Sequence, residues 1–224
     1  MTLAFDAPPA RVWEHVYDQG SPIQYAYRTQ LDPLWAFQNV YSSRPWAAET
    51  PSAGRPFSWD LLLALRRRSV QVEALTHATG LSSTGDQKLD SSLPWAERYE
   101  IPASTAAAVN GAVREGRRVV AVGTSVMRAL ESAALETGQV PSGPGVASLV
   151  IEERHALRVT HGLVTGIHSP KESHCRLLRA LVDSRTLARS SLEAKKAQLV
   201  EHEEGDVALF LPGTLTQSAS SMWT

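Results

Sequence analysis

The chain has 224 residues, 43% of them hydrophobic, and a formal net charge of −1 at pH 7, so it can bury a sizeable core and has no overall attraction for nucleic acid. Its one cysteine, Cys175, excludes an internal disulfide framework and fits a reducing cytoplasm, where we expect the protein to lie. The sequence has no metal-binding spacing of histidine and cysteine and no apolar run long enough to cross a membrane, so we expect no bound metal and no membrane association.

The N-terminal part of the chain is predicted to be mainly helical. Apolar side chains recur at helical spacing in residues 10–19, directly after two prolines, which predicts an amphipathic helix. A short helix is expected after Pro33, and residues 58–68 are predicted to form a helix with Ser58 as its N-cap. Residues 51–56 contain prolines and a glycine and are expected to form an ordered loop between these helices.

Short strands are predicted to alternate with helices in the rest of the chain. Apolar runs and alternations predict strands within 23–27, 70–76, 99–101, 119–122, 147–152, 157–167 and 203–213. Helical spacing predicts helices at 103–116, from 126 onward, at 173–183 and at 184–202. This order indicates an α/β fold with a mixed, partly parallel sheet flanked by helices. We expect an N-terminal helical segment at 1–22, a single α/β core domain at 23–212 and a flexible tail at 213–224.

The stretch Arg117–Ser132 combines a strand, a glycine turn and a helix. Residues 119–122 are predicted to form a buried strand, Gly123 breaks the pattern, and helical spacing follows, with Thr124 or Ser125 as the expected N-cap. The free backbone N–H groups of such a helix start favour a carboxylate or phosphate ligand. A capped helix that follows a core strand explains the same residues without any ligand.

Three polar loops are predicted to follow strand ends, at residues 77–83, 123–125 and 165–173. In open α/β sheets the ligand crevice lies outside the carboxyl ends of the strands, so we expect these loops to converge. Two of them carry a histidine, His77 and His168, and histidine can transfer a proton near neutral pH. Either histidine is also explained by a purely structural role.

Six segments, in this order, resemble those of a known family. They are PSAGRPF (51–57), LTHATGLSS (75–83), ERYEIP (97–102), VVAVGTSVMRALES (119–132), GLVTGIHSPKESH (162–174) and EEGDVALF (203–210). From Ile23 to Phe210 the chain is similar, in register, to the S-adenosylmethionine:tRNA ribosyltransferase-isomerase family of queuosine biosynthesis. Members transfer and isomerise the ribosyl part of S-adenosylmethionine onto the aminomethyl group of a 7-deazaguanine in tRNA, and adenine and methionine leave. The resemblance implies a transferase that consumes S-adenosylmethionine and needs no metal.

This chemistry makes demands that named residues can meet. The sulfonium acidifies the neighbouring C5′ hydrogens, so a base is needed, and the departing adenine gains from protonation or hydrogen bonding. The candidate catalytic residues are His77, His168 and Glu97. The residues expected to bind S-adenosylmethionine are Ser52, Gly54, Arg55, Phe57, Gly80, Tyr99, Gly123, Thr124, Ser125, Arg128, Thr165, Gly166 and Ser173.

Within this set, the charged and aromatic side chains have distinct expected roles. Arg55 and Arg128 are candidates for holding the methionine carboxylate, and an aromatic face such as that of Phe57 or Tyr99 would stabilise the sulfonium. Two purely structural alternatives remain open. In one, Arg128 forms an ion pair with Glu131, three residues later on the same helix. In the other, Glu97 and Arg98 form an ion pair on the surface.

The chain also departs from the family pattern. Family members carry an N-terminal segment and an inserted β-barrel domain that we expect this chain to lack. Trp95 replaces a family histidine, Gly166 replaces an asparagine, and Glu203-Glu204 replace a serine-tyrosine pair, so we expect weak, salt-sensitive tRNA binding. The acceptor is either a small molecule or tRNA. The alternative function is an S-adenosylmethionine-binding subunit that is non-catalytic or depends on a protein partner or a second copy to complete the site.

Overall fold

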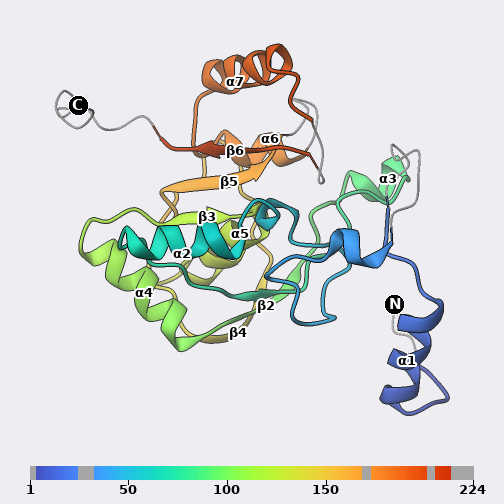
Figure 1. Ribbon diagram of the computed structural model, residues 1–224. Coiled ribbons are helices and arrows are strands. Elements are labelled where there is room, and N and C mark those ends of the chain that lie inside the picture. Colours follow the sequence, from blue (N-terminus) through green and yellow to red (C-terminus); the bar gives the residue numbers. More distant parts are fainter. Residues whose placement is uncertain (1–3, 25–32, 168–172, 201–204, 213–224) are drawn as a thin grey trace. The chain divides into compact units, whose positions relative to one another are not determined.

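The computed structural model describes residues 4–24, 33–167, 173–200 and 205–212 (Figure 1). The chain divides into two compact units, Met1–Asn39 and Val40–Thr224. This division differs from the expected boundary after residue 22, and the expected tail at 213–224 lies outside the described residues. Every helix in the described ranges is too short or too polar to cross a lipid bilayer.

The first unit contains the predicted N-terminal helix. Helix α1 spans Pro9–Gln19 and begins with a proline at its first position, as the sequence predicts. A 3₁₀ helix, η1, spans Leu34–Phe37 and confirms the short helix expected after Pro33. Most of the predicted strand at 23–27 lies outside the described residues.

The second unit contains two three-stranded sheets. One is antiparallel, in the order β1-β2-β4, and consists of β1 (Thr76–His77), β2 (Glu97–Ile101) and β4 (Gly143–Ala147). The other has the order β3-β5-β6 and consists of β3 (Val120–Val122), β5 (Gly162–Gly166) and β6 (Val207–Phe210). Strands β3 and β5 are parallel, whereas β5 and β6 are antiparallel. The mixed, partly parallel α/β fold is therefore confirmed, with its strands divided between two sheets.

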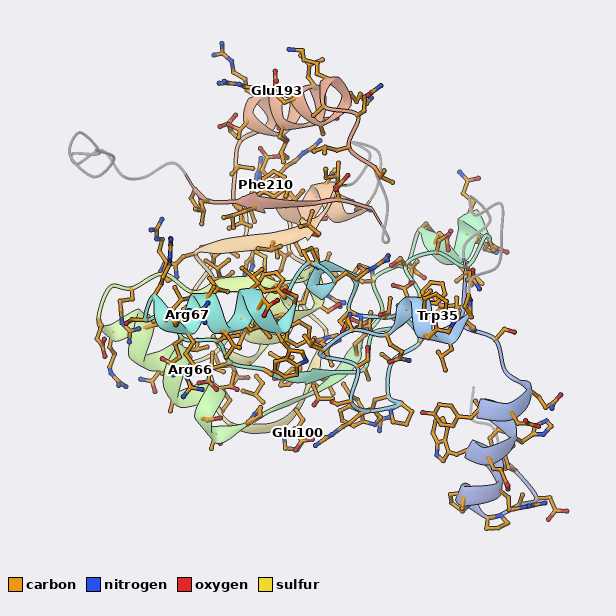
Figure 2. The ribbon with its side chains drawn as sticks, in the orientation of Figure 1. Trp35, Arg66, Arg67, Glu100, Glu193 and Phe210 are labelled. Atoms are coloured by element: carbon orange, nitrogen blue, oxygen red, sulfur yellow. The ribbon has the colours of Figure 1, made fainter. Side chains whose placement is uncertain are left out.

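Helices connect and cover these strands. They are η2 (Ser52–Gly54), α2 (Trp59–Arg67), α3 (Gln87–Asp90), α4 (Ala103–Arg114), α5 (Thr124–Ala133), α6 (Ser173–Leu178) and α7 (Ser184–Lys196). The predicted N-cap of α2 is confirmed, because the Ser58 hydroxyl accepts a hydrogen bond from the Leu61 N–H. Arg66 and Arg67 lie in its last turn, where positive charge is favourable (Figure 2).

Helix α5 lies between the two sheets (Figure 1) and belongs to both apolar cores. Ala129 and Leu130 pack in a core with Tyr99 and Ile101 of β2, whereas Met127 packs in a second core with Leu163 of β5. Met127 and Ala129 are fully buried. Burial of a side chain as large as Met127 or Leu130 stabilises a fold by roughly 2 kcal/mol, so α5 is a principal element that ties the two sheets together.

Three predicted elements were placed wrongly. The strand expected at 147–152 is β4, which ends at Ala147; Pro144 is tolerated within it because β4 is an edge strand and needs no second ladder. In the strand expected at 70–76 only Thr76 pairs with another described strand. The helix expected at 173–183 ends at Leu178, and Asp183, expected within it, instead caps the next helix by accepting a bond from the Thr186 N–H.

Candidate active site

Glu97, at the start of β2, is the centre of a buried polar cluster. Its side chain is 10% exposed, and each carboxylate oxygen has a partner. Oε1 accepts a hydrogen bond of 2.5 Å from the backbone N–H of Gly80, and Oε2 accepts one of 2.5 Å from Nη1 of Arg128. Glu97 is therefore not the surface partner of its neighbour Arg98, whose guanidinium lies over the ring of Trp46.

Arg128, in the second turn of α5, is buried and donates hydrogen bonds to several segments. Besides Glu97, its guanidinium donates to the backbone carbonyls of Trp95, Ala147 and Leu149, at 2.9, 3.1 and 3.2 Å. Burial lowers the pKa of Arg128, and the adjacent Glu97 carboxylate opposes this shift. These donors serve protein acceptors, so a methionine carboxylate would have to compete with four bonds.

Glu131 does not pair with Arg128, so the expectation of a self-satisfying helical pair is wrong. Its carboxylate is fully buried and accepts hydrogen bonds from the backbone N–H groups of Arg158, Val159 and Thr160. The two side chains leave α5 toward different segments, where each is held by several buried hydrogen-bond partners. Glu131 thereby binds α5 to the segment that leads into β5.

His77, the last residue of β1, is the one titratable side chain of the cluster with an unused nitrogen. Its side chain is 6% exposed. Nδ1 lies 3.3 Å from Oγ1 of Thr79, while Nε2 lies 3.8 Å from Oε2 of Glu97 and has no hydrogen-bond partner among the described residues. Burial, followed by the positive charge of Arg128, lowers the pKa of His77 to about 4. The ring is therefore neutral at physiological pH.

The start of α5 completes the cluster. Gly123 is its N-cap and has a φ of 101°, which favours glycine, and no side chain caps the helix; the expected capping by Thr124 or Ser125 is wrong. The Ser125 hydroxyl instead accepts a bond of 3.4 Å from the Thr79 hydroxyl. The amino end of this ten-residue helix therefore lies beside the segment that follows His77, and its dipole favours a negative group there.

Two of the three predicted loops, 77–83 and 123–125, thus meet. Of the third, 165–173, the described part nearest to them is the end of β5. The backbone N–H of Gly123 donates to the carbonyl of Val164 in β5, so the end of β5 lies beside the glycine turn. A side chain at Gly123 would come 3.9 Å from the Cβ of Ala53, which places η2 at the same turn. His168 lies outside the described residues, so its predicted catalytic role stays a prediction.

The remaining residues predicted to bind S-adenosylmethionine lie in several elements. Ser52 and Gly54 lie in η2, and Gly80 and Thr124 lie within or directly beside the polar cluster. Arg55 is exposed and Phe57 is half-buried, both just after η2; Thr165 and Gly166 are buried within β5, and Ser173 begins α6.

Tyr99 belongs to the apolar core. It packs against Gly145 of β4 so closely that a Cβ at that glycine would lie 2.3 Å from the tyrosine ring. Burial also raises the pKa of its phenol. This packing favours a structural role for Tyr99, and its predicted contact with a sulfonium stays a prediction.

Thr79 is the residue of the cluster that sequence reasoning missed. It bridges His77 on β1 to Ser125 on α5. The available signal was its position two residues after His77, since alternate residues of an extended segment share a face. Among the described residues, no three histidine, cysteine, aspartate or glutamate side chains gather in a possible metal site.

Comparison with known proteins adds an independent line of information. The sequence model of the family described as "Queuosine biosynthesis protein" matches residues 1–210. The S-adenosylmethionine:tRNA ribosyltransferase-isomerase of Gloeobacter violaceus is 36% identical over 180 residues, which are 79% of this chain and 51% of that protein. The protein of the same name from Thermus thermophilus is 37% identical over 185 residues, covering 80% and 52%.

A solved structure is similar as well. The crystal structure of S-adenosylmethionine tRNA ribosyltransferase from Thermotoga maritima matches with a TM-score of 0.57 and 25% identity, over 71% of this chain and 51% of that one. The chain therefore spans about half the length of the relatives it matches.

Proposed function

Because the chain belongs to the queuosine biosynthesis protein family, we propose that it binds S-adenosylmethionine beside the start of α5 and uses its ribosyl part in a transfer that releases adenine and methionine. The observation that carries this proposal is the neutral, buried His77, whose Nε2 has no hydrogen-bond partner among the described residues and whose ring is linked through Thr79 to the uncapped start of α5. The proposal rests on the names of the relatives and on the chemistry that this cluster can supply.

In this proposal His77 acts as the base. With the Thr79 hydroxyl donating to Ser125, Thr79 accepts from Nδ1–H, and the lone pair of His77 lies on Nε2. Nε2 would take a C5′ proton next to the sulfonium, and the Glu97 carboxylate 3.8 Å away would stabilise the imidazolium that forms. Glu97 itself is a weaker candidate base, because both of its oxygens already accept bonds from Gly80 and Arg128.

The methionine carboxylate is assigned to the first turn of α5. Thr124 and Ser125 present backbone N–H groups there without a side-chain cap, whereas the N–H of Gly123 is bound to the Val164 carbonyl. A helix dipole stabilises a nearby anion by about 0.3–1 kcal/mol, or more where it is buried. This assignment does not require Arg128 to leave its buried partners.

Binding of S-adenosylmethionine is expected to raise the stability of the protein. At a ligand concentration ~100-fold above Kd the free energy of unfolding should increase by ~2.7 kcal/mol, which thermal unfolding measures directly. Adenosine, which lacks the sulfonium and the carboxylate, is the control and should stabilise much less. No thermal shift and no calorimetric heat at millimolar S-adenosylmethionine would contradict the proposal.

The acceptor is proposed to be tRNA, as in the names of the relatives, with a small-molecule acceptor as the competing substrate class. The net charge of −1 leaves only local positive patches, such as the exposed Arg66 and Arg67 on α2 (Figure 2), to contact phosphates.

We therefore expect weak tRNA binding that decreases steeply as salt is raised, and a titration at several salt concentrations measures it. Tight binding that persists at physiological ionic strength would contradict this expectation and would support a tRNA-specific surface on this chain.

One assay separates the proposed enzyme from a subunit that only binds the cofactor. The protein is incubated with S-adenosylmethionine alone and with tRNA carrying the aminomethyl 7-deazaguanine, and released adenine and methionine are separated by chromatography. Release with tRNA supports the transferase. Binding without release supports the subunit, a reading favoured by the fact that the chain spans about half the length of its relatives. In that case, release restored by a partner chain would identify a shared site.

A further inference from the structure

Two side chains, those of Arg128 and His77, lie close to the same carboxylate oxygen of Glu97. Oε2 of Glu97 is 2.5 Å from Nη1 of Arg128 and 3.8 Å from Nε2 of His77. The first distance is a charge-assisted hydrogen bond and the second is too long for one. The carboxylate is therefore committed to the arginine, although a histidine nitrogen lies nearby.

We propose that Arg128 is a positioning residue, which holds the Glu97 carboxylate and thereby leaves the buried Nε2 of His77 without a charged hydrogen-bond partner among the described residues. Arg128 itself is held by the carbonyls of Trp95, Ala147 and Leu149, so it cannot follow the carboxylate if Glu97 turns toward the histidine. The second carboxylate oxygen is held by the Gly80 N–H, in the segment just after His77. Glu97 is thus fixed from two sides.

Three charged or titratable groups beside His77 are Glu97 and Tyr99 on β2 and Arg128 on α5, and Tyr99 is the direct cross-strand partner of His77. Burial raises the pKa of Tyr99, so its phenol is uncharged at neutral pH and does not favour a protonated histidine. Arg128 and Glu97 therefore oppose each other at the ring. If Arg128 is removed, the carboxylate remains buried beside His77, and the natural outcome is that the imidazole takes up a proton and pairs with it.

The test is an NMR titration of the histidine side-chain nitrogens in the protein without S-adenosylmethionine. The signals of His77 are identified by their loss in His77→Gln. In the wild type, His77 should be neutral with its proton on Nδ1 and should remain so until the pH falls well below 6.5. In Arg128→Gln, the pKa of His77 should rise to about 6.5 or higher.

Two further variants make the result specific. In the double variant Arg128→Gln, Glu97→Gln the rise should disappear, because no carboxylate is left to pair with the ring. Arg98→Gln is the matched control: it removes an arginine of β2 that lies over Trp46 and should leave the pKa of His77 unchanged. A rise of the same size in Arg98→Gln, or a rise that survives in the double variant, would overturn the proposal.

The proposal can still be tested if Arg128→Gln fails to fold. The double variant has no uncompensated buried charge and can be titrated in its place. The wild-type titration is also a test by itself, because a His77 that is already protonated near pH 6.5 or above would overturn the inference. The inference deepens the proposed function, because it concerns the residue assigned as the base. Its test uses no substrate, so a failure here is distinguishable from a failure to release adenine.

Discussion

Replacement of His77 by glutamine is expected to lower the rate of adenine release by ~10²–10⁴-fold, with the melting temperature within a few degrees of the wild type. The loss follows from removal of the one cluster side chain that has both a neutral form at physiological pH and an unused nitrogen among the described residues. Binding of S-adenosylmethionine should be much less affected, since the start of α5 is unchanged. Single-turnover rates and ligand-induced thermal shifts measure the two effects separately.

The chain contains a matched control for this experiment. His155 also has a buried Nε2 with no partner among the described residues, 3.8 Å from a carboxylate oxygen, that of Glu131. The Glu131 carboxylate accepts hydrogen bonds from the backbone N–H groups of residues 158–160, away from the start of α5. His155→Gln should therefore retain turnover. Equal activity in both variants would remove His77 from the mechanism and direct attention to Glu97 and His168.

Stability is expected to fall by roughly 3 kcal/mol as the pH is lowered from 6.5 to 4, as the contribution of His77 alone. The folded protein holds the pKa of His77 at about 4, whereas the unfolded chain has the ordinary value of 6.5. Between these values the unfolded state binds the extra proton, so acid favours unfolding. Above pH 6.5 both states are neutral, and this contribution vanishes.

Urea unfolding of the wild type and of His77→Gln at several pH values isolates this contribution. The difference between the two free energies of unfolding should change with pH between 4 and 6.5 and should be constant above 6.5. A wild type and a His77→Gln variant with parallel pH curves would show that burial does not suppress protonation of this ring.

Helix α5 contributes residues both to the polar cluster and to the two apolar cores. Arg128 bonds to β2 and to the end of β4, whereas Glu131 bonds to the segment that leads into β5. A substitution on this face of α5 therefore alters both the site and the connection between the two sheets.

The sequence by itself determined the features that depend on near neighbours in the chain. The order of strand, glycine turn and helix around Gly123 and the Ser58 cap of α2 are confirmed, because each is set by residues within a few positions of one another. The predicted burial of this strand is confirmed for Ala121 but is wrong for Val120, which is exposed. The six ordered segments also identified the family, which the match over residues 1–210 confirms. Local periodicity also placed His77 at the end of a strand, whereas Glu97 lies on β2, two residues before the strand predicted at 99–101.

Only the tertiary structure decided which of these residues are partners. Helical spacing predicts that Arg128 meets Glu131, yet Arg128 bonds to Glu97, 31 residues away, and Glu131 bonds to backbone groups 27–29 residues away. Buried charges select the partners that satisfy most of their hydrogen-bonding groups, and those partners arrive with other strands. The neutrality of His77 has the same origin, since burial and the charge of Arg128 exist only once β1, β2 and α5 have packed together.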